Sequence, residues 1–262
     1  MDNERNPKHA AGNAGLIYKA AQLATHEVTA EELKAINKYT LEPLEAADVF
    51  TFKAVLCDNE LDRDYERFSV KALQDLKKLF LGKTVIKNHS WDADGQVARI
   101  YATELVTSEN AVTKSGEPYT QLVAHCYMVR TESNKDLIAE IKGGIKKEGS
   151  VGCAVSSSIC SICGVDNAKK YCPHWPGRSY GNEGDAKVCT FVLNGAKDAY
   201  EFSLVAVPAQ KAAGVSKSYT GETVYAPAEE PAPAPADGAA AKEHERLLAL
   251  RARIVNTKNH NI

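Results

Sequence analysis

Two different spacings of apolar residues occur in the central part of the chain. Over residues 50–56 every second residue is apolar, which predicts a strand with one buried face. Over residues 70–80 apolar residues recur every three or four positions, which predicts an amphipathic helix. Ser69 precedes this helix as an N-cap, and Gly82 follows it at the kind of position where helices often end.

Further runs of apolar and β-branched residues, bounded by turn residues, predict the rest of a sheet. The predicted strands cover residues 84–86, 96–106, 119–129, 149–157, 188–193 and 200–207. A second helix is expected after Ser133. Strands outnumber helices and do not alternate strictly with them. The predicted fold class is therefore α+β and mainly β, with a curled antiparallel sheet or barrel and helices around it.

Changes in composition set the predicted domain boundaries. Residues 1–47 form an N-terminal arm with a short helix that begins at Thr29, and residues 48–218 form the globular domain. Residues 219–241 are rich in Pro and Ala and predict an extended linker. Residues 242–262 predict a C-terminal amphipathic helix and tail. Because that helix has no partner of its own nearby, we expect it to bind another copy of the chain or another protein.

Charge and hydropathy exclude some classes of partner. The chain has 32 basic and 34 acidic residues, so nucleic acid is not an expected partner. The first residues are polar and no apolar run is long enough to span a bilayer, so we expect neither a signal peptide nor a membrane segment. These features favour a cytosolic location.

The seven cysteines fall into two groups. Those at positions 57, 126, 153 and 189 have apolar neighbours and are interpreted as small core hydrophobes. The other three lie near a histidine, in a predicted insertion at residues 158–184. An odd number of cysteines, with one group in apolar surroundings and the other near a histidine, favours a reducing compartment and one metal site over a disulfide framework.

The spacing of Cys160, Cys163, Cys172 and His174 predicts a metal knuckle. A Cys-x2-Cys turn places two thiolates on one side of a tetrahedron, and Zn²⁺ is the natural ion for such donors. Four protein ligands leave no open coordination position, so the predicted zinc is structural. The alternatives are free thiols in a flexible loop, a redox Cys-x2-Cys pair and a nucleic-acid-binding knuckle.

A second set of residues has the side chains that activation of a serine nucleophile requires. Serine needs a base that accepts its proton and a third group that orients the base. Ser150, His89 and Glu201 are the candidates for these three roles. Gly149 and Gly152 flank the serine, and we interpret them as allowing a tight bend that brings amides close to an oxyanion. Each residue taken alone is more often an ordinary loop or strand residue.

The order of these three residues resembles that of the prohead, or capsid-maturation, serine proteases of tailed bacteriophages, which are relatives of the herpesvirus assemblins. The resemblance is carried by Ser-x-Gly at 150–152, by Glu-x-Ser-Leu-Val-x-Val-Pro-Ala at 201–209 and by Asp-Arg-Asp at 62–64. It covers about residues 50 to 215. It implies Ser150 as the nucleophile, His89 as the base and Glu201 as the third member, with His125 as a rival for that third role.

The resemblance also implies a function. An assemblin-like serine endopeptidase would cleave scaffold and capsid proteins, and itself, during phage head assembly. It would work in the cytoplasm of the bacterial host, inside the immature capsid. Its partners would be capsid and scaffold proteins and further copies of the chain in a homo-oligomer. The alternative is a catalytically inactive scaffold or capsid-binding protein with the same fold and a structural zinc loop.

Overall fold

The structure is a computed structural model that describes residues 28–182 and 184–216. The predicted linker at 219–241 and the predicted C-terminal helix and tail at 242–262 lie outside these residues. The elements in chain order are α1 (Ala30–Ile36), η1 (Ala46–Asp48), β1 (Val49–Asp58), β2 (Glu66–Phe68), α2 (Val70–Leu79), β3 (Thr84–Lys87), η2 (Ala93–Gly95), β4 (Ala98–Val112), β5 (Pro118–Val129), η3 (Glu132–Asn134), α3 (Lys135–Lys142), β6 (Gly149–Cys160), β7 (Ser179–Tyr180), β8 (Lys187–Val188), β9 (Phe191–Leu204) and β10 (Gly214–Ser216).

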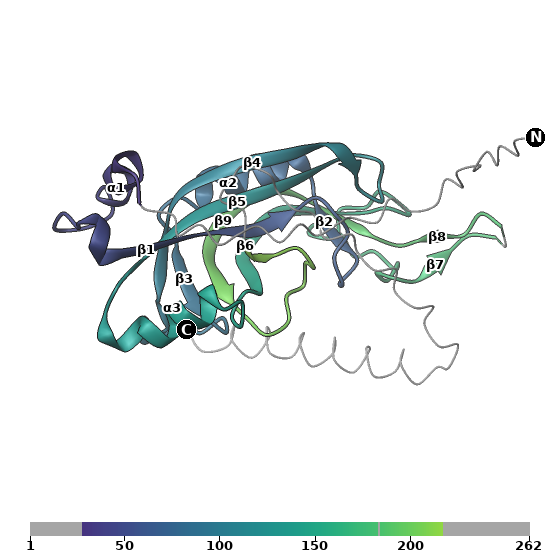
Figure 1. Ribbon diagram of the computed structural model, residues 1–262. Coiled ribbons are helices and arrows are strands. Elements are labelled where there is room, and N and C mark those ends of the chain that lie inside the picture. Colours follow the sequence, from purple (N-terminus) through teal and green to yellow (C-terminus); the bar gives the residue numbers. More distant parts are fainter. Residues whose placement is uncertain (1–27, 183, 217–262) are drawn as a thin grey trace, which may run out of the picture. The chain divides into compact units, whose positions relative to one another are not determined.

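One large sheet dominates the molecule (Figure 1), in the order β10-β1-β5-β4-β3-β9-β2, with β6 paired to β9. The fold is thus α+β and mainly β, as predicted. The predicted antiparallel sheet or barrel is wrong in two respects. β2 and β3 run parallel to β9, and the sheet does not close into a barrel. β10 has only three residues and reaches the start of β6 through an isolated bridge between Glu148 and Gly214, which is too short a ladder to close the sheet.

The core lies where α2 packs on the sheet. The helix presents its apolar side mainly to β9, β4 and β5, as the period of its sequence predicts. The largest fully buried side chains there are Leu56, Leu73, Leu76, Phe80, Ile100, Leu122, Met128 and Phe202. Among the helices of the described segments, none has the length and apolar composition that crossing a membrane requires.

Local capping signals place two of the three α-helices of the described segments. Thr29 and Glu32 form the capping box at the start of α1, and the Ser69 hydroxyl accepts a hydrogen bond from the Ala72 amide in α2. The predicted cap at Ser133 is wrong. Helix α3 begins at Lys135, and the Ser133 hydroxyl instead hydrogen-bonds the Thr131 hydroxyl.

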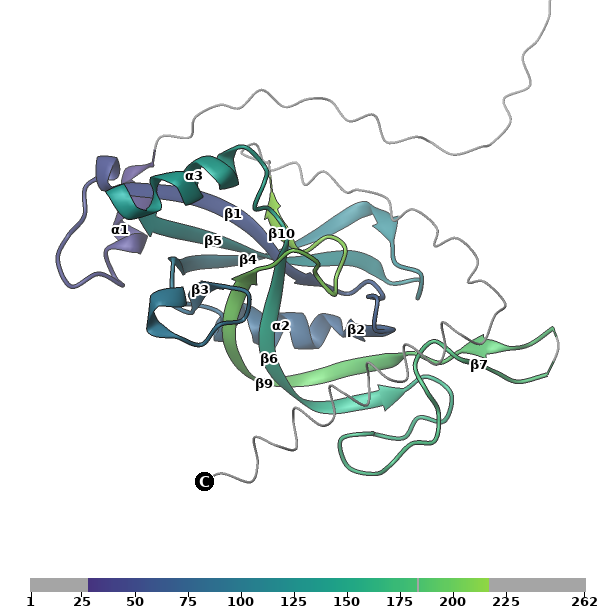
Figure 2. The ribbon, with the colours of Figure 1, turned by 90° about the horizontal axis from the view of Figure 1, so that it is seen from below.

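Strands β6 and β9 form a long antiparallel hairpin (Figure 2), which was predicted as three separate strands. The ladder runs from Gly149 opposite Leu204 to Cys160 opposite Phe191. Residues 161–182 and 184–190, including the short β7–β8 ladder, form the tip of this hairpin. The cysteine-rich insertion therefore extends the hairpin and leaves the pairing at its base intact.

Candidate functional site

The backbone turns sharply after β3 and carries His89 back over β9. The Asn88 amide donates to the Leu204 carbonyl, which continues the parallel pairing of β3 with β9 by one residue. Asn88 and His89 then adopt left-handed φ angles of 52° and 53°. Such angles are unfavourable for residues other than glycine and need support from their surroundings. Part of that support is a 2.8 Å hydrogen bond from the His89 amide to the Ser203 hydroxyl.

The His89 imidazole lies within hydrogen-bonding distance of Glu201, the predicted third member of the triad. Its Nδ1 lies 2.8 Å from Glu201 Oε1, and the side chain of Glu201 is 5% exposed whereas that of His89 is 44% exposed. A carboxylate accepts hydrogen bonds, so the proton of the neutral ring sits on Nδ1 and Nε2 is the basic nitrogen. The hydrogen bond that His89 donates to Glu201 raises the pKa of His89, partial burial opposes this shift, and the attraction of the carboxylate adds to it.

The second oxygen of Glu201 is buried without a partner. Oε2 has no hydrogen-bond partner within residues 28–182 and 184–216. An unsatisfied buried acceptor costs about 1–3 kcal/mol. Glu201 is therefore a poor contributor to stability at this position, and its hydrogen bond to the imidazole is its main interaction. A buried polar group without a partner calls for an explanation, and a catalytic role is one such explanation.

Ser150 lies on the strand next to Glu201. It pairs with Ser203 in the β6–β9 ladder, and Gly152 pairs with Glu201. Directly opposed residues share a face, and so do residues two apart in one strand, so Ser150 projects from the same face as Glu201. Opposed Cβ atoms are about 4.5–5.5 Å apart, which keeps Ser150 near Ser203 and hence near the His89 backbone. The Ser150 hydroxyl forms no hydrogen bond with another residue of the described segments.

The two glycines beside Ser150 have a different role from the predicted one. Both lie in extended β6 and neither has a left-handed φ, so the expected tight bend is absent. A Cβ at Gly152 would lie 2.5 Å from Glu201 Oε1, and one at Gly149 would lie 2.1 Å from the Phe202 ring. They make room for the buried carboxylate on one face and for a core aromatic ring on the other.

The rival histidine belongs to another part of the sheet. His125 lies on β5, and its Nε2 is 2.9 Å from Glu104 Oε1 on β4. No hydrogen bond connects it to His89 within the described segments. His125 is therefore not in a position to orient that ring.

Two segments that carry the family resemblance touch each other. The Arg63 guanidinium donates to the Pro208 carbonyl at 2.7 Å, and the Arg63 amide donates to the Ala209 carbonyl at 3.2 Å. Asp62 folds this turn, because its Oδ1 accepts from the amides of Asp64 and Glu66. The Asp-Arg-Asp turn thus anchors the chain just beyond β9.

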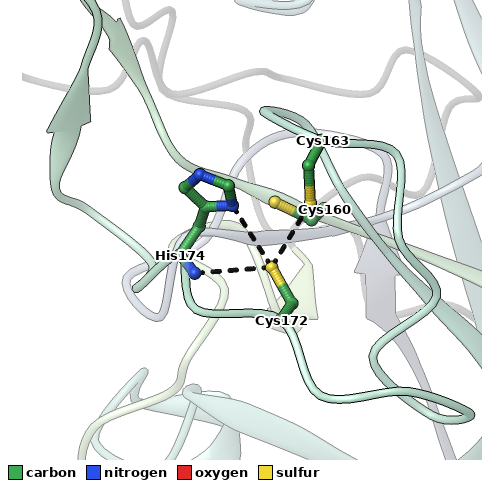
Figure 3. A group of neighbouring side chains, drawn as sticks. All are labelled: Cys160, Cys163, Cys172 and His174. Carbon is green, nitrogen blue, oxygen red and sulfur yellow. Dashed lines mark hydrogen bonds between the residues drawn. The ribbon is translucent and has the colours of Figure 1, made fainter.

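The four predicted metal ligands come together at the hairpin tip (Figure 3). One donor atom from each of Cys160, Cys163, Cys172 and His174 lies within 4.8 Å of all the others, and the cysteines are free thiols. The Sγ atoms of Cys163 and Cys172 are 3.5 Å apart, and Cys172 Sγ lies 3.4 Å from His174 Nδ1. The amides of Ile162 and His174 point at the sulfurs of Cys160 and Cys172, each at 3.4 Å. The donor set and its spacing fit a metal site.

Sequence reasoning missed a further thiol at this site. Cys189, which was interpreted as a core hydrophobe, is fully buried with its Sγ 3.8 Å from Cys160 Sγ. It packs in a small cluster with Cys160, Cys172 and Phe191. Its spacing from the knuckle in sequence gave no signal, because only the β6–β9 pairing brings it back to Cys160.

The two candidate centres lie at opposite ends of one strand. Ser150 pairs near the base of the hairpin, and Cys160 pairs at its tip, ten residues further along β6. At about 3.3 Å per residue the two positions are on the order of 30 Å apart along the strand. The metal cluster therefore has no direct contact with the chemistry of the His89–Glu201 pair.

No family model, curated protein or solved structure matches this chain.

Proposed function

We propose that the chain is a serine endopeptidase in which Ser150 is the nucleophile, His89 the general base and Glu201 the group that orients the base. The hydrogen bond between His89 Nδ1 and Glu201 Oε1 carries the proposal. Three neighbouring strands support it: β3 leads to His89, β9 carries Glu201 and β6 carries Ser150. Convergence of a base, an acid and a hydroxyl from separate segments is the arrangement that activates serine.

The proposed reaction proceeds through an acyl-enzyme. His89 Nε2 takes the Ser150 hydroxyl proton as the serine oxygen bonds to the scissile carbonyl carbon, and Glu201 stabilises the imidazolium that forms. The imidazolium then gives its proton to the leaving amine as the C–N bond breaks. Water, deprotonated by the same nitrogen, hydrolyses the ester and releases Ser150.

The resemblance to prohead proteases supplies the proposed biological role. The substrates are capsid and scaffold proteins, and the chain itself, during head assembly inside the immature capsid of a tailed phage. The contact between the Asp62–Asp64 turn and Pro208–Ala209 supports this assignment, because two motifs that carry the resemblance meet in space. A homo-oligomer in the bacterial cytoplasm and an assemblin-like fold belong to the same proposal.

Co-expression with a capsid precursor tests the activity. We expect Ser150→Ala to fold like the original protein and to abolish cleavage of the precursor and self-cleavage, as gel analysis and intact mass show. Ser157→Ala is the matched control, because Ser157 lies on the same strand and is also half-buried. Cleavage that persists in Ser150→Ala would remove this serine from its role.

At the hairpin tip we propose a structural Zn²⁺ held by Cys160, Cys163, Cys172 and His174. Three thiolates and one imidazole suit zinc, and four protein donors complete its tetrahedral coordination. When bound, the ion crosslinks the loop and leaves no open position for substrate. The amides that point at the sulfurs of Cys160 and Cys172 support thiolate ligands at these positions.

One observation favours a second function, that of an inactive scaffold or capsid-binding protein. The Ser150 hydroxyl makes no hydrogen bond to the imidazole in the described segments, although such bonds often tighten only when substrate binds. In this alternative the original protein and Ser150→Ala bind the capsid precursor equally, and neither cleaves it.

A further inference from the structure

The hairpin tip holds more soft donors than one tetrahedral ion can use. Cys160, Cys163, Cys172 and His174 already supply four donor atoms. Cys189 brings a fifth, fully buried and 3.8 Å from Cys160 Sγ. Two thiolates on one tetrahedral zinc, each about 2.3 Å from the ion, lie about 3.8 Å apart. The Cys160–Cys189 separation therefore equals that of two thiolates on one ion.

The backbone holds Cys189 beside the loop that carries His174. The Cys189 amide donates to the Arg178 carbonyl at 2.8 Å, and the Gly177 amide donates to the Cys189 carbonyl at 2.9 Å. On its other side Cys189 precedes β9, whose first residue pairs with Cys160. Cys189 is thus fixed between two ligand-bearing segments by main-chain bonds.

Its surroundings distinguish Cys189 from the other buried thiols. Cys57 and Cys126 belong to the main core, among aliphatic and aromatic side chains. The buried cluster of Cys189 contains two predicted ligands, Cys160 and Cys172, beside Phe191, and three partly buried apolar residues pack against it: Ile162, Val165 and Tyr180.

We propose that Cys189 is a metal ligand of this centre that alternates with His174 for the fourth coordination position. The centre then has two donor sets, three thiolates with an imidazole and four thiolates, that share Cys160, Cys163 and Cys172. The inference rests on the metal centre of the proposed function and is independent of the protease chemistry. The exchange keeps the ion bound when the His174 imidazole is displaced.

Titration of the full chain with Co²⁺ tests this proposal, because tetrahedral Co²⁺ absorbs in the visible range and thiolate ligands add charge-transfer bands. The four proteins compared are the original chain, His174→Ala, His174→Ala with Cys189→Ser, and Cys153→Ala as a control thiol on β6. Serine is nearly isosteric with cysteine, which limits any effect on packing. Circular dichroism of each protein verifies that it folds.

We expect His174→Ala to bind one Co²⁺ with tetrahedral absorption and with stronger thiolate charge transfer per ion than the original chain. The double variant should bind at least about tenfold more weakly and lose that added intensity. Identical spectra and affinities for His174→Ala and the double variant would overturn the role of Cys189, as would complete loss of binding in His174→Ala alone. Absence of tetrahedral Co²⁺ in the original chain would overturn the metal centre itself.

Discussion

At the scale of single residues, the geometry around His89 depends on features that a sequence pattern describes only in part. The residue types of the His89–Glu201 pair were predictable, because serine chemistry needs a base and an acid. The left-handed backbone at Asn88 and His89 was missed, although asparagine and histidine adopt this conformation more often than most residues other than glycine. The role of Gly152 was also missed. A glycine that makes room for a carboxylate on the opposite strand looks the same in sequence as a glycine in a turn.

The pH dependence of activity reports the His89–Glu201 contact. The hydrogen bond that His89 donates to Glu201 raises the pKa of His89. The base works only when its ring is neutral, so activity rises as pH increases through this raised pKa. In Glu201→Gln we expect the acidic limb of kcat/KM to move to lower pH, and kcat to fall by up to about 10⁴-fold. Peptide hydrolysis between pH 5 and 9 measures both effects.

Glu104→Gln provides the matched control for this experiment, because it alters a second histidine–carboxylate pair of the described segments, at His125. Its pH profile should coincide with that of the original protein. An unshifted limb in Glu201→Gln would show that the carboxylate does not act on the base.

At the scale of elements, the β6–β9 hairpin connects the two candidate centres. Helix starts were predictable at Thr29 and Ser69, where a local side chain satisfies an amide of the first turn. The single 14-residue strand β9 was predicted as two strands, because Gly195 interrupts its apolar pattern. The β6–β9 ladder shifts register between Gly152 and Cys153 and again between Ala154 and Val155. Such bulges depend on the partner strand, which the local sequence does not identify.

The metal centre at the hairpin tip should contribute to folding stability. A bound ion crosslinks the tip loop to the end of β6, and the free energy of its binding adds to that of folding. We expect a chelator, or Cys163→Ser, to lower the midpoint temperature of thermal unfolding. The shift should be about 2–4 °C for each 1 kcal/mol of unfolding free energy that is lost. Differential scanning calorimetry with and without chelator measures this change. A chelator that acts equally on the original protein and Cys163→Ser would contradict the assignment, since the variant should no longer respond.

At the scale of the whole molecule, the class of fold was predictable and the closure of the sheet was not. Many strands with few helices between them indicate a mainly β protein. Whether the outer strands meet depends on strand order and on the length of the last strand. β10 spans only Gly214–Ser216, and the parallel pairs of β2 and β3 with β9 join segments distant in sequence. No local pattern encodes either feature.

Stability should increase on the acidic side of neutrality. Burial raises the pKa of Asp58 and Asp62 to about 6 and that of Glu66 to about 7. The fold favours the protonated forms of these carboxyls. The free energy of unfolding therefore decreases as the pH rises from their ordinary pKa values through the raised pKa values. The raised pKa of His89 acts in the same direction, because its contribution is complete below the ordinary pKa and lost above the raised one.

Urea unfolding at pH 5.5 and pH 8 measures this dependence. We expect a larger free energy of unfolding at pH 5.5, and a smaller difference between the two pH values in Glu66→Gln. Equal stability at both pH values would contradict the burial of these acids.

The activation of Ser150 can be measured by reaction of the purified protein with a fluorophosphonate, which labels serine hydroxyls that a neighbouring base activates. Intact mass and peptide mapping should find one adduct, on Ser150, that His89→Ala abolishes and Glu201→Gln slows. An unlabelled Ser150, or labelling that persists in His89→Ala, would contradict the proposed roles of Ser150 and His89.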